Sequence, residues 1–266
     1  MGSKMQNHKK LENIKLFVLD MDGTFYLGNK ILEGALGFIE KVKESGKDFI
    51  FFTNNSSKAP EDYIEKLKKM NCNIQRKDIM TSADVTIEFL KTQYKDAKVY
   101  LLGTKELEKS FIESGIPLVD EGPDIVVVGF DMTLTYEKLE KACTYIRNGA
   151  KFIATHLDIN CPTEDGFIPD CGAICAAIQL STGATPEYMG KPFDKTVELV
   201  TSRTKYKRDE IAFVGDRLYT DVATGVNNGC MGILVLTGET KLSDVETSSI
   251  QPDFIFNSLK EMGEVI

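Results

Sequence analysis

Two carboxylates two positions apart stand in the part of the sequence best suited to chemistry. Asp20 and Asp22 belong to the segment DMDGT at residues 20–24, and Asp20 ends the apolar run at residues 15–20. Side chains two positions apart on an extended chain lean the same way, and Gly23 permits a sharp turn after them. A solvated turn is the alternative interpretation of such a segment, so the pair alone does not establish a site.

A second acidic pair follows another apolar run near the end of the chain. Asp216 and Asp221 lie in the segment GDRLYTD, directly after the strand pattern IAFVG at residues 211–215. Asp216 falls where the expected strand ends, and Asp221 falls in the first turn of the helix expected next. Favourable charge at a helix N-terminus is the structural alternative for Asp221.

Hydroxyl and amide groups gather at the end of a third apolar run. Thr53 ends the pattern DFIFFT at residues 48–53, and Asn54 and Asn55 follow it with two serines. Hydroxyl and backbone N–H donors at a strand end suit the oxygens of a phosphate group. Capping of the next helix is the alternative, and it is the better interpretation for the two serines.

The functional interpretation of these sites is stronger when they are considered together. Each lies at the carboxyl end of an expected core strand, including Lys191, which stands between Gly190 and Pro192 after the pattern at residues 187–189. In a parallel sheet such positions converge on one edge, where open α/β sheets bind their ligands. Converging carboxylates repel one another and an incoming phosphate, so the sequence predicts a hard divalent cation with oxygen ligands, Mg²⁺, together with the positive charge of Lys191.

The elements that position these residues alternate along the whole chain. Short apolar strand patterns alternate with helical ones, which is typical of an α/β fold with a mostly parallel sheet. The middle of the chain repeats this alternation on its own, and residues 156–167 read as a loop. We therefore predict a Rossmann-like parallel-sheet core at residues 1–82 and 184–266, interrupted by an inserted α/β domain at residues 83–183.

Composition limits the classes of function. The 266 residues carry a net charge of −8, which disfavours a nucleic-acid-binding surface. No apolar run is long enough to span a bilayer, and the polar start of the chain does not resemble a secretory signal. We therefore expect a cytoplasmic protein that acts without nucleic acid or membrane.

The cysteines do not form paired metal-binding motifs. A zinc site built from His156, Cys161, Cys171 and Cys175 is conceivable from their proximity in sequence. Cys171 and Cys175 are four positions apart in an expected helix rich in alanine and isoleucine, which suits packing. Ordinary buried thiols are the preferred interpretation.

At this point the sequence resembles the haloacid dehalogenase (HAD) superfamily, and within it the NagD-like phosphatases with an α/β cap. Four motifs match in order over nearly the whole chain: DMDGT at residues 20–24, Thr53-Asn54, Lys191, and GDRLYTD at residues 215–221. The insertion between the second and third motifs corresponds to the cap of this branch. The resemblance implies a phosphoric monoester hydrolase that requires Mg²⁺ and acts on a small phosphorylated metabolite.

The resemblance also implies a role for each motif residue. Asp20 would be the nucleophile that forms an aspartyl-phosphate, and Asp22 the general acid and then the general base. The cation would be held by the Asp20 carboxylate, the Asp22 backbone carbonyl and Asp216. Asp221 would support these ligands without binding the cation itself. Lys191 would neutralise charge on Asp20 and the phosphoryl group, whereas Thr53, Asn54 and Asn55 would bind phosphoryl oxygens.

Several alternatives stay open at the level of sequence. Related phosphatases often read Ala-Thr-Asn-Pro-Asp where this chain has Ala-Thr-His156-Leu157-Asp158, so His156 and Asp158 are candidates for substrate specificity. A non-catalytic phosphometabolite-binding protein and a phosphomutase are the rival functions. The presence of Asp22 favours phosphatase or mutase chemistry over dehalogenation, and the resemblance is compatible with a monomer or a homodimer.

Overall fold

The computed structural model describes residues 11–163 and 166–266. Close contacts divide the chain into two compact units. The first unit comprises Met1–Phe52, Ile64–Met80 and Lys191–Ile266, and the second comprises Thr53–Tyr63 and Thr81–Gly190. Each unit therefore contains segments that are far apart in sequence. The core and inserted domain predicted from the sequence have different limits from these two units, and those domain limits stay a prediction.

A six-stranded sheet organises the first unit. Its strand order is β14-β13-β12-β1-β4-β5, and the pairings from β14 through to β4 are parallel. The strands are β1 (Leu16–Leu19), β4 (Asp48–Thr53), β5 (Ile79–Thr81), β12 (Ile211–Gly215), β13 (Met231–Val235) and β14 (Phe254–Phe256). All four residues of β1 are buried, as expected for a central strand covered on both faces. The predicted α/β fold is thus confirmed.

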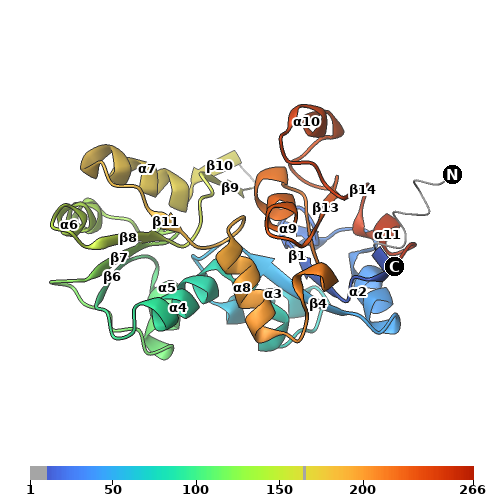
Figure 1. The fold of residues 1–266 in the computed structure, drawn as a ribbon, viewed down its shortest axis with the longest axis horizontal. Helices are drawn as coiled ribbons and strands as arrows, with labels where there is room; N and C mark the ends of the chain where they lie inside the picture. The colour runs from blue at the N-terminus through green and yellow to red at the C-terminus, as the bar shows by residue number, and fades with distance from the viewer. Residues whose placement is uncertain (1–10, 164–165) are drawn as a thin grey trace. The chain divides into compact units, whose positions relative to one another are not determined.

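Helices flank this sheet in the first unit (Figure 1). They are α2 (Ala35–Glu44), α8 (Asp194–Arg203), α9 (Ala223–Asn227), α10 (Leu242–Thr247) and α11 (Leu259–Met262), with short 3₁₀ turns η1 (Arg76–Asp78) and η2 (Arg208–Glu210). Helix α3 (Pro60–Lys69) crosses from the second unit into the first. A small antiparallel ribbon of β2 (Tyr26–Leu27) and β3 (Lys30–Ile31) follows β1.

The order of the strands marks the place where a ligand is expected. From β1 the chain continues to β4 on one side, whereas β12 pairs with β1 on the other, in the register Leu19 opposite Val214. Ligands of open α/β sheets bind beyond the carboxyl ends of strands where the order reverses. The ends of β1 and β12 form such a point.

The second unit contains its own four-stranded sheet, with the order β11-β8-β7-β6 and parallel pairing throughout. Its strands are β6 (Val99–Leu102), β7 (Ile125–Val128), β8 (Lys151–Ala154) and β11 (Glu187–Tyr188), and its helices are α4 (Ser82–Gln93), α5 (Lys105–Glu113), α6 (Tyr136–Arg147) and α7 (Cys171–Thr182). Figure 1 shows α6 and α7 on the opposite side of this sheet from α4 and α5.

Two local expectations from the sequence are wrong, and a third is confirmed. The strand expected at residues 187–189 among the core strands is β11, which pairs with β8 of the second unit. The loop expected at residues 156–167 contains β9 (Asn160–Thr163), which pairs antiparallel with β10 (Gly166–Pro169). The helix expected to begin near residue 219 is confirmed: it begins with a π-helical turn, η3 (Leu218–Val222), and continues as α9. The partner of β11 is distant in sequence, and β9 and β10 lack an apolar pattern of their own.

The described helices are all too short or too polar to cross a lipid bilayer.

Candidate active site

Three carboxylates meet at the ends of β1 and β12. Asp20 follows β1 directly, and its backbone N–H donates to the carbonyl of Val214 at 2.9 Å. Asp216 follows β12, and Asp221 lies in η3. Each of these aspartates offers an oxygen within 4.8 Å of the others. The structure therefore brings together three residues that are separated by up to about two hundred positions in the sequence.

Lys191 lies between two of these carboxylates. Its Nζ donates to Oδ1 of Asp20 at 2.6 Å and to Oδ1 of Asp221 at 2.6 Å, and the lysine is only 3% exposed. Its ammonium group also lies over the ring of Phe52, 5.5 Å from the centroid. One buried cation is thus shared by two carboxylates, which lowers their mutual repulsion.

The backbone packs directly against Asp216. Its Oδ2 accepts from the N–H of Glu239 at 2.7 Å, and its Oδ1 accepts from the hydroxyl of Thr24 at 3.2 Å. A Cβ atom at Gly23, where φ is +89°, would lie 2.6 Å from that Oδ2, and one at Gly238 would lie 2.0 Å from it. These two glycines therefore leave the carboxylate the space it occupies. The contact of Thr24 was not predicted, although its place in the DMDGT segment is a signal for it.

Burial and like charge disfavour ionisation of Asp20 and Asp216. Burial, with Asp221 and Asp216 adding repulsion, raises the pKa of Asp20 to about 8 despite the opposing effect of Lys191. Burial and Asp221 likewise raise the pKa of Asp216 to about 6. Burial alone would lower the pKa of Lys191, but Asp20 and Asp221 more than offset this and hold it above its ordinary value. The group carries more negative charge than one ammonium can balance.

The donor set of this group fits a hard divalent cation. All three candidate ligand groups are carboxylates, and Mg²⁺ prefers oxygen ligands, of which one or two carboxylates are typical. Asp221 already accepts from Lys191 and from the N–H of Arg217 at 3.1 Å. Asp20 and Asp216 are therefore the better candidates for direct ligands, and Asp221 for a residue that holds Lys191.

This electrostatic imbalance predicts how stability depends on pH when no divalent cation is present. The folded-state pKa values of Asp20 and Asp216, about 8 and about 6, lie above the ordinary value of 3.8. The folded state therefore binds more protons than the unfolded state between these values, and stability falls as pH rises. We expect the free energy of unfolding in EDTA to fall by about 2–4 kcal/mol between about pH 5 and pH 8. Urea unfolding at constant ionic strength measures it.

The control for this experiment is Asp20→Asn, which should show a shallower decline over the same range. Burial lowers the pKa of His156, but Cys171 and Asp170 raise it to about 9, so this residue also loses its proton in the folded protein as pH rises. His156 is common to both proteins and cancels in the difference between them. A wild-type profile no steeper than that of the variant would contradict the prediction.

Asp22 lies beside this group on an exposed turn. The residue is exposed and forms an isolated bridge with Tyr26, while the N–H of Gly23 donates to the carbonyl of Tyr26 at 2.8 Å. This hydrogen bond closes the turn after β1. The backbone of Asp22 is thus fixed in the turn, and the residue is exposed to solvent.

Thr53, Asn54 and Asn55 belong to the second unit. Thr53 is the last residue of β4, and its hydroxyl accepts from the N–H of Asn55 at 3.2 Å. The side-chain oxygen of Asn55 accepts from the N–H and the hydroxyl of Ser57, at 3.0 and 2.7 Å. The carbonyl of Asn54 accepts from the hydroxyl of Ser82 at 2.5 Å. These bonds define a structured turn directly after the strand.

His156 and Asp158 also lie in the second unit, in the segment that follows β8. Both are buried, and Nε2 of His156 is 2.8 Å from Oδ1 of Asp170. Asp170 was not predicted, because nothing in its local sequence distinguishes it from an ordinary helix cap. The thiols of Cys171 and Cys175 are buried, whereas Cys161 is partly exposed.

Comparisons with known proteins agree with this geometry. Residues 17–117 match the family model described as haloacid dehalogenase-like hydrolase, and residues 188–262 match one described as HAD-hydrolase-like. An acid sugar phosphatase from Staphylococcus haemolyticus (strain JCSC1435) is 36% identical over 94% of this chain and 95% of its own length. The acid sugar phosphatase of Staphylococcus aureus (strain MRSA252) is 37% identical over 94% of this chain and 97% of its own.

Solved structures extend the similarity to the fold. The 4-nitrophenylphosphatase from Thermotoga maritima is 46% identical, with a TM-score of 0.93 over 96% of this chain and 98% of that one. NagD from E. coli K-12 is 31% identical, with a TM-score of 0.88 over 95% of this chain and 99% of that one. The chain therefore belongs to the haloacid dehalogenase superfamily and is a NagD-like phosphatase.

Proposed function

We propose that this phosphatase hydrolyses small phosphate monoesters, sugar phosphates foremost, through a covalent aspartyl-phosphate on Asp20 and with Mg²⁺ as cofactor. The observation that carries the proposal is the position of the Asp20 carboxylate. It lies at the end of the central strand, 2.6 Å from Nζ of Lys191 and within 4.8 Å of oxygens of Asp216 and Asp221. The acid sugar phosphatases among the relatives support the substrate class.

In the first step a carboxylate oxygen of Asp20 attacks phosphorus, and the bond from phosphorus to the leaving oxygen breaks. Asp22 donates a proton to that oxygen, whose electron pair would otherwise carry a full negative charge. In the second step Asp22 accepts a proton from water, which attacks the phosphorus of the aspartyl-phosphate and releases inorganic phosphate. Asp20 is thereby regenerated as a carboxylate.

Lys191 and the aspartates prepare Asp20 for this attack. Lys191 holds one oxygen of Asp20 in place and offsets its negative charge, and Asp221 fixes the ammonium from the other side. Asp20, the backbone carbonyl of Asp22 and Asp216 would hold Mg²⁺. The cation would supply charge stabilisation for the transferring phosphoryl group. We assign the binding of phosphoryl oxygens to Thr53, Asn54 and Asn55.

The test is a screen of phosphorylated metabolites with purified protein and Mg²⁺. We expect release of inorganic phosphate, with sugar phosphates among the best substrates, and loss of release when EDTA removes the cation. Acid quenching during turnover of a radiolabelled phosphoester should trap label on the protein. Isomerised product without inorganic phosphate would instead indicate a mutase. Tight binding without any release across the panel would indicate a non-catalytic binding protein.

A further inference from the structure

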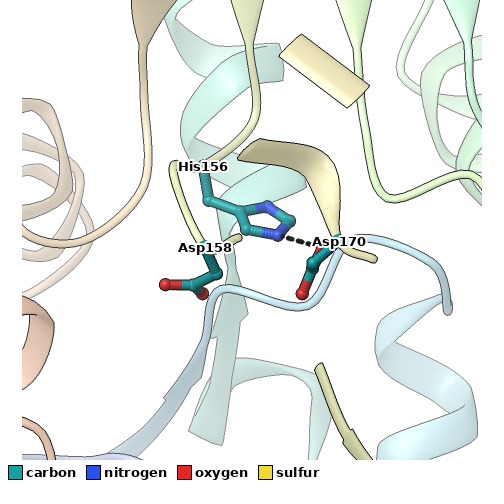
Figure 2. A group of neighbouring side chains, drawn as sticks. All are labelled: His156, Asp158 and Asp170. Carbon is teal, nitrogen blue, oxygen red and sulfur yellow. Dashed lines mark hydrogen bonds and ion pairs between the residues drawn. The ribbon is translucent and has the colours of Figure 1, made fainter. Parts of the chain in front are cut away.

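A second group of ligand-type side chains is buried in the second unit. His156 and Asp158 follow β8, and Asp170 is the N-cap residue of α7. They are 0%, 5% and 4% exposed, respectively. Each offers one ligand atom within 4.8 Å of the others, and Figure 2 shows the imidazole above the two carboxylates.

The hydrogen bonds within this group leave one oxygen without a donor. Nε2 of His156 is 2.8 Å from Oδ1 of Asp170, a contact drawn as a dashed line in Figure 2, and Nδ1 is 2.9 Å from the hydroxyl of Thr155. Oδ2 of Asp158 accepts from the side-chain amide of Asn54 at 3.2 Å. Oδ1 of Asp158 is buried and has no hydrogen-bond partner among the residues that the structure describes.

Such an arrangement is unfavourable unless a cation completes it. A buried carboxylate oxygen without a donor has lost its hydration and gained no hydrogen bond in exchange, and this is more unfavourable when the group is charged. With a protonated imidazole, the two carboxylates leave this group a net charge of −1. A divalent cation bound by a neutral imidazole and two carboxylates brings the net charge to zero and gives Oδ1 of Asp158 a partner.

We propose that His156, Asp158 and Asp170 bind a divalent transition-metal ion, of which Zn²⁺ is the best match. Zn²⁺ accepts imidazole nitrogen and carboxylate oxygen together, whereas Mg²⁺ prefers oxygen ligands alone. The ligand set therefore distinguishes this site from the all-carboxylate group at Asp20. It also differs from the cysteine-containing zinc site considered from the sequence, since His156 alone is shared between them.

The backbone already holds the three ligands together. The N–H of Gly172, in the first turn of α7, donates to the carbonyl of Asp158 at 2.8 Å, and the N–H of Asp170 donates to the carbonyl of Ile159 at 2.8 Å. A Cβ atom at residue 172 would lie 2.2 Å from the carbonyl oxygen of Leu157, so glycine is required for this approach. The ligand-bearing segment is thus fixed on the start of α7 without any ion.

Outer hydrogen bonds complete the arrangement. The hydroxyl of Thr155 can accept from Nδ1–H of His156, which leaves Nε2 free for a metal ion. The amide of Asn54 orients Asp158. Partners of this kind fix the tautomer and direction of metal ligands in proteins. Three protein ligands leave a fourth tetrahedral position for water, and the ion would join the segment after β8 to α7.

The experiment measures metal binding and is independent of phosphatase activity. Protein stripped with EDTA is saturated with Mg²⁺ and titrated with Zn²⁺ alone by calorimetry, for wild type, His156→Gln, Asp158→Asn and Asp216→Asn. We expect Zn²⁺ binding to persist in Asp216→Asn. In His156→Gln and Asp158→Asn, Zn²⁺ affinity should fall by more than roughly 10- to 100-fold. That is the loss caused by removing a residue that only hydrogen-bonds to a metal ligand. Anomalous scattering at the zinc edge should place the ion among the three ligands.

Asp131→Asn is the matched control. Asp131 is another buried carboxylate of the second unit, but its oxygens accept from Thr133 and Lys138, so Zn²⁺ binding should be unchanged in this variant. Thermal unfolding of each variant verifies that it is folded. The proposal is overturned if Asp216→Asn abolishes all Zn²⁺ binding, because the ion then binds only at the Asp20 group. It is also overturned if crystals soaked in Zn²⁺ or Mn²⁺ show no anomalous peak at His156. Failure of either kind leaves the proposed hydrolysis at Asp20 intact.

Discussion

Asp20→Asn is expected to lower kcat for phosphoester hydrolysis by at least about 10⁴-fold, because an amide oxygen cannot form the covalent intermediate. At 1.36 kcal/mol for each tenfold change, this corresponds to a loss of about 5 kcal/mol or more of transition-state stabilisation. Initial rates of phosphate release with Mg²⁺ present measure the effect. The acid-quench experiment should find no label on the variant protein.

The same substitution should not unfold the protein. It removes one of the negative charges that are only partly balanced by Lys191, so its stability in EDTA near neutral pH should equal or exceed that of wild type. Asp131→Asn is the control for loss of a buried carboxylate elsewhere, and we expect it to retain near-normal turnover. A folded Asp20→Asn protein that hydrolyses phosphoesters at the wild-type rate would exclude Asp20 as the nucleophile.

The sequence predicted the strands that carry the reacting groups because those strands are buried and apolar. β12 matches the predicted limits at residues 211–215, and β4 matches them at residues 48–53. Such strands are determined mainly by their own residues, since both faces must be covered. The meeting of Asp20 with Asp216 follows from the parallel pairing of β1 and β12, which the alternation of strands and helices also predicted.

The errors concern elements whose partners are distant. β11 has only two residues, and its place beside β8 depends on the second unit as a whole. The hairpin of β9 and β10 contains proline and mostly exposed positions, so it lacks the alternation of apolar residues that would have identified it. Local patterns do not specify such pairings.

The site residues also include some that local sequence identifies and others that only the fold reveals. Asp20, Lys191 and Asp216 could be identified because each stands at a strand end or between Gly and Pro. The bridging of Asp20 and Asp221 by Lys191 was not predicted, because Asp221 was expected to support the metal ion instead. Asp170 was missed altogether. These contacts depend on side-chain directions that only the folded chain defines.

Lys191→Met is expected to be the most destabilising single substitution at this site. The ammonium is almost fully buried and bonds to both Asp20 and Asp221, so its removal leaves these two buried carboxylates without their shared ion-pair partner. Breaking a buried ion pair by removing one partner typically costs about 3–5 kcal/mol. We expect a loss of that size in EDTA, measured by urea unfolding, and a smaller loss with Mg²⁺, because a bound cation restores part of the balance.

A double-mutant cycle separates this electrostatic cause from simple loss of packing. If the cost arises from uncompensated charge, Lys191→Met combined with Asp221→Asn should destabilise the protein by less than the sum of the two single substitutions, with an interaction energy of about 1–3 kcal/mol. Lys138→Met is the matched control, because Lys138 bonds to Asp131 at 2.7 Å but is 31% exposed, and ion pairs that remain in contact with water contribute less. Additive effects in the cycle would mean that Lys191 contributes mainly by packing. Because Asp20 would then not depend on the ammonium for its charge balance, such a result would also weaken the role proposed for Lys191 in preparing the nucleophile.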